Sequence, residues 1–404
     1  MRVVVVGAGG REAVLAEVLG RTAEVVVTPG NPGIPGSVPT DPEALDADLF
    51  VIGPEAPLVD GLADRLRAAG KLVFGPGADG AQLEGSKAWM KELVTAAGVP
   101  TARYGSFSDE AEAIAFLASL PGPYVVKTDG LAAGKGVLVT DDRADAEADV
   151  RDKLSGAAFG AAGSRVVIEE GMSGPEVSVF AVCDGTDTVV LDPAQDFKRV
   201  GDGDAGPNTG GMGAYCPLPW LPAGFGDDIA ERFIRPTLAE LRRRGIDYRG
   251  VLYAGLMLTA DGARLVEYNV RFGDPDSQVV LLRLTSDLAA LLAEAAAGAL
   301  SSTPTYADDA AVLVVAAAEG YPTDVRTGDR IEGLDAARSV PDASVYAAGV
   351  TAGEDGALLT GGGRVLDVVG RGPDVAAARA RAYEALGHLR WPGLHHRGDI
   401  AAGA

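Results

Sequence analysis

The chain has few of the residues from which disulfide frameworks, most zinc sites and nucleophilic triads are built. Its 404 residues include only two cysteines, Cys183 and Cys216, which excludes a disulfide framework and a cysteine-rich metal site. The three histidines, His388, His395 and His396, all lie late in the chain, which argues against a histidine zinc site or a serine–histidine triad. Any chemistry that this chain performs therefore rests on other groups.

Positive charge is also scarce. The sequence has 35 Lys and Arg against 57 Asp and Glu, a formal net charge of −22, which disfavours nucleic acid or an anionic membrane as a partner. No apolar run is long enough to span a bilayer, and the chain opens with a strand-like run rather than a charged-then-apolar leader. We therefore expect a cytoplasmic protein that is a monomer and acts on small molecules.

A chain of this length is too long to fold around a single hydrophobic core, so we expect several domains. The patterns of predicted strands and helices indicate where the domains begin and end. Residues 1–100 alternate short β-branched runs with helical stretches, which predicts an open α/β domain. A central domain over residues 101–300 ends before a Ser-Ser-Thr-Pro-Thr boundary segment. Residues 305–404 contain further strands and a helix over 374–386, which predicts a small α+β cap.

A glycine-rich loop with a lysine at each end lies between two short apolar runs in residues 124–140. The β-branched runs predict the strands of a hairpin. The glycines allow close backbone approach to a ligand, and Lys127 and Lys135 are placed to grip a triphosphate. A P-loop is excluded, because Gly130 and Gly134 have only three residues between them and a strand follows rather than a helix. We predict a mobile hairpin that closes over phosphates, with an ordinary solvated hairpin as the alternative.

A glycine turn at residues 7–12 follows the first predicted strand and precedes a helix. This order is typical of the start of a doubly wound fold, whose helix N-terminus is available to an anion. The turn lacks the third glycine of the dinucleotide fingerprint, because Glu12 stands in its place. We therefore assign Gly10, Arg11 and Glu12 to a small phosphorylated sugar, with a solvated first helical turn as the alternative.

Carboxylates stand at the ends of several predicted strands. Glu55 follows the third strand, and we expect it either to accept hydrogen bonds from ribose hydroxyls or to cap the next helix. Glu169 and Glu170 end one strand and Glu176 begins another, which suits an adenine amino group and ribose hydroxyls or, alternatively, plain surface charge. Lys87 lies near a helix start, where its charge opposes the helix dipole and indicates a phosphate partner.

Residues 195–215 form a long, polar and glycine-dense segment. An irregular loop of this length inside a compact domain is either functional or disordered, and its apolar anchors favour function. We place Asp196 among the catalytic residues. The substrate contacts expected here are Lys198, Asn208, Thr209, Gly210, Gly211 and Met212.

A predicted strand over residues 264–271 places Glu267, Asn269 and Arg271 on one face. Carboxylate and amide oxygens are hard ligands that suit Mg²⁺. Arg271 beside them is able to hold a substrate carboxylate with two hydrogen bonds, and Asp274 follows in a Gly-Asp-Pro turn as a further substrate contact. The alternative is an amphipathic strand with one wet face.

Several motifs in a fixed order carry a family resemblance along nearly the whole chain. They are GPEAPL, LEGSK, DGLAAGKGV, QDFKR, GPNTGGMGAY, NVRFGDP and a final Arg397-Gly-Asp399-Ile400. The set resembles the glycinamide ribonucleotide synthetases, which are phosphoribosylamine–glycine ligases of the ATP-grasp superfamily. The resemblance implies an N-terminal α/β domain, a central ATP-grasp domain with a mobile lid over residues 123–188, and a C-terminal α+β cap. It also implies that glycine takes the γ-phosphoryl group of ATP and that phosphoribosylamine attacks the acyl phosphate.

The resemblance further implies roles for individual residues, with ATP and Mg²⁺ or Mn²⁺ as cofactors. The residues implied for ATP are Lys87, Lys127, Gly134, Lys135, Gly136, Glu169, Glu170 and Glu176. Those implied for the metal are Glu267 and Asn269, and those implied for glycine and the phosphosugar are Arg271, Gly10, Arg11, Glu12 and Glu55. Because no enzyme nucleophile is required, catalysis by Arg271, Lys135 and Asp196 would rest on positioning and charge neutralisation.

Three positions depart from the family pattern. The family usually has histidine where Ala13 and Ala347 stand and glutamate where Asp276 stands. These changes lie in or near substrate-facing segments, so the alternative is an ATP-grasp ligase for another carboxylate and amine. A nucleotide-binding protein without turnover and a dehydrogenase are two further alternatives.

Overall fold

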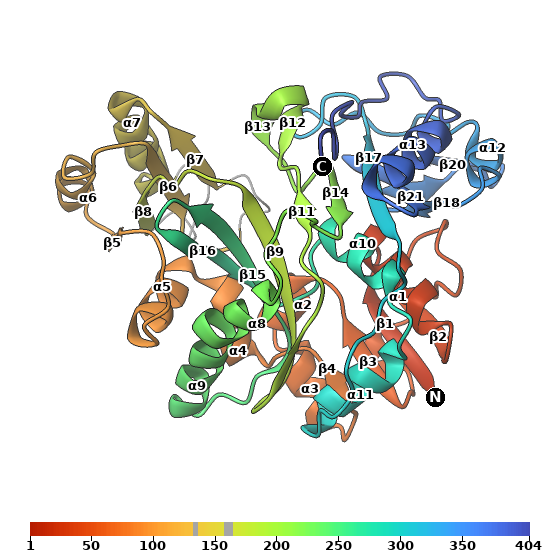
Figure 1. Ribbon diagram of the computed structural model, residues 1–404, viewed down its shortest axis with the longest axis horizontal. Helices are drawn as coiled ribbons and strands as arrows, with labels where there is room; N and C mark the ends of the chain where they lie inside the picture. Colours follow the sequence, from red (N-terminus) through yellow and green to blue (C-terminus); the bar gives the residue numbers. More distant parts are fainter. Residues whose placement is uncertain (132–135, 157–164) are drawn as a thin grey trace.

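In the described parts of the chain, four sheets of four or five strands carry the fold (Figure 1). The structure is a computed structural model that describes residues 1–131, 136–156 and 165–404. The sheet built from residues 104–170 and the sheet of the C-terminal segment lie on opposite sides of the molecule in Figure 1, and a third sheet lies between them.

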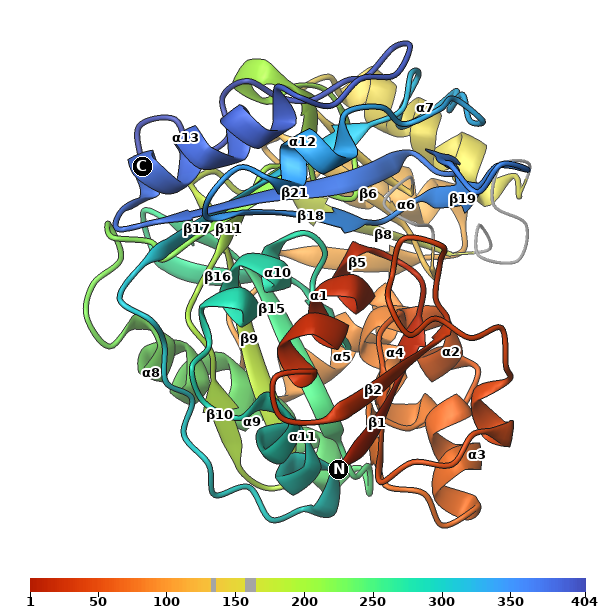
Figure 2. The same ribbon diagram turned by 90° about the vertical axis from the view of Figure 1, so that its right-hand side faces the viewer.

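The N-terminal segment forms a parallel sheet, which confirms the predicted strands. In sheet order they are β2 (Glu24–Pro29), β1 (Arg2–Gly7), β3 (Leu49–Ile52) and β4 (Val73–Phe74). The helices of this segment are α1 (Gly10–Leu19), a 3₁₀ turn (Pro42–Ala44), α2 (Glu55–Val59), α3 (Leu62–Ala68) and α4 (Ala78–Gly85). Because β2 and β3 flank β1 on opposite sides, the carboxyl ends of β1 and β3 border a switch point where such sheets bind ligands. Figure 2 shows α1 beside β1 and β2.

A second, antiparallel sheet confirms the predicted hairpin. Its strands in sheet order are β5 (Tyr104–Phe107), β8 (Val166–Glu170), β6 (Tyr124–Thr128) and β7 (Val137–Thr140). The nearby helices are α5 (Lys87–Ala96), α6 (Glu110–Leu117) and α7 (Arg143–Leu154). The sheet has a hydrophobic cluster of its own, in which Val126 and Ile168 are fully buried. Residues 132–135 of the hairpin, with Gly134 and Lys135, lie outside the described residues.

The third sheet is antiparallel and lies at the centre of the molecule (Figure 1). Its strands in sheet order are β10 (Thr188–Val190), β9 (Glu176–Asp184), β15 (Arg249–Thr259) and β16 (Gly262–Asn269). The helices in residues 225–297 are α8 (Phe225–Ile229), a π-helical turn (Ala230–Ile234), α9 (Arg235–Arg243), α10 (Asp276–Arg283) and α11 (Leu288–Ala297). No helix in the described ranges is long and apolar enough to cross a membrane.

The fourth sheet joins the C-terminal segment to strands from the middle of the chain. Its order is β11 (Gln195–Asp196), β14 (Gly213–Cys216), β17 (Ala310–Ala317), β21 (Arg364–Gly372) and β18 (Ala343–Ala347), and its helices are α12 (Leu334–Arg338) and α13 (Val375–Leu386). Two small hairpins are β12 (Arg199–Gly201) with β13 (Ala205–Asn208), around a 3₁₀ turn (Asp202–Asp204), and β19 (Val350–Ala352) with β20 (Leu358–Thr360). Residues 195–215, expected as an irregular loop, are thus largely short strands, because neighbouring segments supply partners for their backbone.

The last segment of the chain fastens the β12–β13 hairpin. Arg397 is 1% exposed, stacks over the Phe197 ring at 5.0 Å and pairs with Asp204 and Asp399 at 2.7 Å. Its guanidinium also donates to the Arg199 carbonyl at 3.1 Å. The C-terminal motif therefore holds in place the hairpin that connects Asp196 and Lys198 to the following glycine-rich turn.

Replacing Arg397 by alanine is expected to lower the free energy of unfolding by about 2 kcal/mol, because a buried cation with carboxylate and aromatic partners is lost. Arg326→Ala is the matched control. Arg326 also pairs with two carboxylates, Glu319 and Asp329, but its side chain is 50% exposed, so we expect a change within about 0.5 kcal/mol. Urea denaturation of both variants checks this, and equal losses would contradict a fastening role for Arg397.

Candidate active site

Strand β16 and the turn after it bring three predicted site residues together. Glu267 is half-buried and Asn269 is 8% exposed, two positions apart on one face of the strand. Arg271 lies just beyond the strand end, and its guanidinium donates to Asn269 Oδ1 at 3.2 Å. The predicted carboxylate, amide and guanidinium groups are therefore neighbours.

Arg271 has several partners within the protein. Its Nε donates to Glu55 at 3.2 Å, one terminal nitrogen donates to Glu84 at 2.9 Å and to Asn269, and the other donates to the Phe272 carbonyl at 3.3 Å. These bonds engage four of the five N–H groups that a guanidinium has. A substrate carboxylate at Arg271 would therefore share it with two glutamates.

Glu84 is a site residue that the sequence analysis missed, although it lies in the LEGSK motif. Its carboxylate also accepts from the Val270 backbone N–H at 2.9 Å, which ties α4 to the end of β16. Burial raises the pKa of Glu84, and the charge of Arg271 opposes this effect. For Glu55, burial would raise the pKa, but the charges of Arg271 and Arg11 and the hydrogen bonds to the carboxylate together hold the pKa below its ordinary value.

Several lysines surround Glu267. Burial alone would raise the pKa of Glu267, but the charges of Lys198, Lys127 and Lys87 outweigh it and keep the pKa below its ordinary value. Lys87 donates from Nζ to the Gly130 carbonyl at 2.8 Å, so the start of α5 meets the glycine-rich loop. Burial lowers the pKa of Lys87. The arrangement is a concentration of positive charge next to one ionised carboxylate.

The three glutamates expected around adenosine have different surroundings. Glu169 is 2% exposed and lies between two lysines, with Lys91 Nζ at 2.9 Å and Lys127 Nζ at 2.8 Å. Glu170 accepts from the Arg103 backbone N–H at 2.9 Å and pairs with Arg264 at 2.9 Å.

The third of these glutamates, Glu176, pairs with Lys198 Nζ at 2.8 Å. Near this pair, burial together with the charges of Asp276 and Glu176 raises the pKa of Asp196 to about 7, against the opposing charge of Lys198. Asp196 is thus a carboxylate that exchanges a proton near neutral pH.

The N-terminal turn is held by its own side chains. Glu12 accepts from the Gly9 backbone N–H and from Arg11 Nε, both at 2.6 Å, and Arg11 also donates to the Phe272 carbonyl at 3.1 Å. A side chain at Gly10 would collide with the carboxylate of Asp367 from β21, which explains why glycine occupies this position. The turn therefore meets both the end of β16 and the C-terminal sheet.

Asp274 is part of a network that joins α10 to the C-terminal sheet. Gln278 donates from Nε2 to Asp274 at 2.9 Å and to Asp367 at 3.2 Å, and Arg364 pairs with Asp274 at 3.1 Å. Burial and the charge of Asp274 raise the pKa of Asp367 to about 7. The sequence analysis did not identify Gln278, Arg364 or Asp367, because no motif places them near the turn.

The remaining predicted contacts come from the glycine-rich turn before β14. Thr209 Oγ1 donates to the Lys198 carbonyl at 2.8 Å and accepts from the Gly211 N–H at 3.0 Å. Gly210 accepts from Arg364 at 2.6 Å. Asn208 ends β13 and is half-buried. Met212 is fully buried and its N–H and carbonyl are both bonded within the fold, so it belongs to the core.

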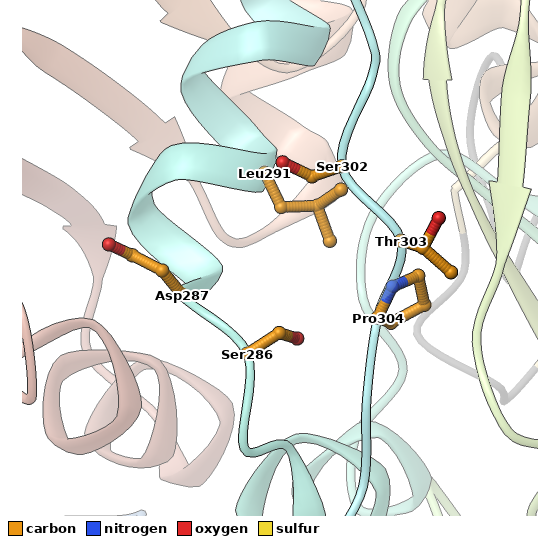
Figure 3. Close-up of a pocket in the computed structure, with 6 residues that line it drawn as sticks. All are labelled: Ser286, Asp287, Leu291, Ser302, Thr303 and Pro304. Atoms are coloured by element: carbon orange, nitrogen blue, oxygen red, sulfur yellow. The ribbon is translucent and has the colours of Figure 1, made fainter.

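Two hollows in the described structure are lined by residues other than these groups. The pocket in Figure 3, of about 130 Å³, is where Leu291 of α11 projects toward the segment of Ser302 and Pro304. Two of its polar groups are already bonded, since Ser302 Oγ donates to Glu294 at 2.7 Å and Ser286 Oγ accepts from the Thr305 N–H at 3.1 Å. A second hollow, of about 470 Å³, is lined by Gln82, Ser86, Ala88, Trp89, Glu92, Tyr104, Ser106 and Arg165. We assign no role to either one.

Models of three domains of one family match almost the entire chain. Residues 1–84 match the phosphoribosylglycinamide synthetase N domain, residues 85–277 match its ATP-grasp (A) domain, and residues 311–403 match its C domain. The matches agree with the order of motifs from which the resemblance was predicted.

Curated relatives and solved structures agree with these models. The phosphoribosylamine–glycine ligase of Streptomyces coelicolor is 48% identical, over 100% of this chain and 99% of that protein, and that of Mycobacterium tuberculosis is 48% identical over 99% and 97%. The crystal structure of the Thermotoga maritima phosphoribosylamine–glycine ligase has a TM-score of 0.87 and 34% identity, covering 99% of this chain and 100% of that one.

A more distant structure shares the fold alone. The biotin carboxylase domain of Hydrogenobacter thermophilus 2-oxoglutarate carboxylase has a TM-score of 0.72 at 16% identity, and it covers 98% of this chain and 91% of that chain. Since relatives of 48% identity match over their full length and the three domain models follow one another along the sequence, the chain belongs to the family of phosphoribosylamine–glycine ligases, the ATP-grasp enzymes of purine biosynthesis.

Proposed function

We propose that the chain joins glycine to 5-phosphoribosylamine while ATP is converted to ADP and phosphate. A carboxylate oxygen of glycine attacks the γ-phosphorus of ATP, which forms glycyl phosphate and releases ADP. The amine nitrogen of phosphoribosylamine then attacks the glycyl carbonyl carbon, phosphate leaves, and the nitrogen loses a proton as the amide forms. The observation that carries the proposal is the group of three lysines and Arg271 around Glu267, in a chain of this family.

Glu267 and Asn269 suit a divalent cation, Mg²⁺ or Mn²⁺. Lysine charges keep Glu267 ionised, and the amide oxygen of Asn269 lies beside it on the same strand face. The described ranges contain no cluster of three or more His, Cys, Asp or Glu residues that could hold a metal. Two protein ligands completed by phosphate oxygens and water are typical of Mg²⁺. When bound, the cation would neutralise charge on the phosphoryl group that is transferred.

The other residues divide between the nucleotide and the two remaining substrates. We assign Lys87, Lys127 and Gly136, with Gly134 and Lys135 of the undescribed hairpin tip, to the phosphates of ATP. We assign Glu170 and Glu176 to direct contacts with its adenosine part. Glu169 is buried between two lysines, so we assign it to this pocket through those neighbours. The residues assigned to glycine and phosphoribosylamine are Arg271, Glu55, Gly10, Arg11, Glu12, Asp274, Lys198, Asn208, Thr209, Gly210 and Gly211.

Asp196 is the group best suited to accept the proton that the amine releases. Its pKa of about 7 means that it is partly ionised at neutral pH, where a general base works most efficiently. Lys198, two residues further on, supplies a positive charge beside it. We propose that Asp196 accepts this proton during amide formation.

Glycine with phosphoribosylamine generated in situ is expected to give the fastest ADP release in a coupled assay across small amino acids. One added methyl group, as in alanine, should lower kcat/KM about tenfold or more. Ala13, Asp276 and Ala347 depart from the family pattern near the substrates, so the screen also includes other amines. Faster turnover with a different carboxylate or amine would replace the proposed substrate pair.

Replacing Glu267 by glutamine is expected to reduce kcat about 100-fold or more, because the site loses its ionised oxygen ligand. The control is Glu240→Gln on α9, a carboxylate that is 6% exposed and pairs with Arg243 and Arg244. The control should retain activity within about twofold. Circular dichroism verifies the fold of both variants, and near-normal turnover of a folded Glu267→Gln enzyme would remove Glu267 from the metal site.

Replacing Asp196 by asparagine is expected to lower kcat about 100-fold and to remove a pH-dependent step. In the native enzyme, protonation of Asp196 below about pH 7 removes the base, so kcat should rise as the pH increases through this value. The amine substrate is the same for both proteins, so its own titration cancels in the ratio of their rates. A ratio that stays constant with pH would exclude Asp196 as the base.

A further inference from the structure

A buried carboxylate lies between two lysine ammonium groups, one of which, Lys127, belongs to the proposed phosphate site. Glu169 Oε2 is 2.9 Å from Lys91 Nζ, and Oε1 is 2.8 Å from Lys127 Nζ. The side chains of Lys91, Glu169 and Lys127 are 0%, 3% and 6% exposed. One negative charge therefore faces two positive charges away from water, and we call these three residues the buried triad.

Each member of the buried triad comes from a different element. Lys91 lies on α5, Glu169 on β8 and Lys127 on β6. Lys91 Nζ also donates to Thr101 Oγ1 at 2.7 Å, and Thr101 Oγ1 donates to the Leu265 carbonyl of β16 at 2.7 Å. The triad is thus joined to the strand that carries Glu267, two residues beyond Leu265.

The charge balance of the triad depends on Lys91. Without it, Glu169 and Lys127 would form a neutral pair, and the positive charge of Lys127 would be cancelled by its neighbour. With it, the carboxylate is matched by Lys91, and the charge of Lys127 remains uncancelled. A buried lysine is costly unless a partner compensates it, and Glu169 at 2.9 Å is the carboxylate that compensates Lys91.

We infer that Lys91 is a positioning residue, which neutralises Glu169 so that Lys127 keeps its charge for the phosphates of the nucleotide. This inference rests on the proposed role of Lys127. It gives Glu169 a different task from direct contact with adenosine, since both of its oxygens face lysines.

The surroundings of Lys91 make its charge sensitive to pH. Burial and, less strongly, the charge of Lys127 lower the pKa of Lys91 to about 8, while Glu169 and Glu267 oppose the shift. The ring of Tyr104 from β5 also faces the ammonium group, at 5.6 Å from its centroid. Above about pH 8, the triad therefore contains one positive and one negative charge, the neutral pair described above.

The experiment measures binding of a nonhydrolysable ATP analogue with Mg²⁺ by calorimetry, independently of turnover. Lys91→Met should weaken binding about tenfold, because Glu169 then cancels the charge of Lys127. Lys91→Met combined with Glu169→Gln should recover most of this loss, because the cancelling carboxylate is also gone. The control, Lys71→Met, removes a lysine that pairs with the exposed Asp46 and should leave binding unchanged.

A purely structural Lys91 gives the opposite pattern. The double variant would then bind as weakly as Lys91→Met or more weakly, and this result would overturn the inference. Native protein should also lose affinity above about pH 8, whereas the double variant should not; this comparison decides the question even if Lys91→Met alone does not fold.

The proposed function is tested separately by Lys127→Met. If that variant binds the analogue normally, the assignment of Lys127 to phosphates is wrong. If it binds weakly while Lys91→Met binds normally, only the inference about Lys91 is overturned.

Discussion

Buried and half-buried carboxylates that hold cations in place are the interaction on which the rest of the site depends. Glu84 and Glu55 fix Arg271, Glu169 faces Lys127, and Glu176 pairs with Lys198. Cations fixed in this way do not have to reorganise when a phosphoryl group develops charge, and such preorganisation is a large contribution to catalysis. The fold serves this arrangement, because α2, α4, β8 and β9 each supply one carboxylate to cations on other elements.

A second consequence of the fold is that the proposed substrate end of the site belongs to no single part of the chain. Helix α10 contacts α1 on one side and β14 and β17 on the other, and Gln278 links Asp274 to Asp367 of β21. Gly10 is required because the Asp367 carboxylate lies against it. Ala13 lies on α1, Asp276 begins α10 and Ala347 ends β18, which also contacts α1, so all three departures from the family pattern lie on elements of this junction. We therefore expect variation in substrate recognition at this junction, away from the lysines.

The sequence predicted strands such as β1, β6 and β8 well, because runs of β-branched residues are typical of buried strands. It predicted the family from motifs, and the comparisons confirm it. Helix α10 was missed because its polar residues, including Gln278 and Arg283, are as buried as its apolar ones and leave no amphipathic period. The partners of Glu169 were also missed, since Lys91 is 78 residues away in sequence and no local pattern encodes that contact.

The chain has only seven lysines, and the places where they lie explain how a protein with a net charge of −22 attracts anionic substrates. Many exposed ion pairs use arginine, as in Arg65, Arg326 and Arg330. In contrast, Lys87, Lys91, Lys127 and Lys198 gather around Glu267 and Glu169. A lysine ammonium is a compact charge whose pKa responds to burial, whereas a guanidinium stays charged and forms planar pairs. An acidic surface repels anions generally, so concentrating these lysines in one place makes the site the favoured destination for a triphosphate.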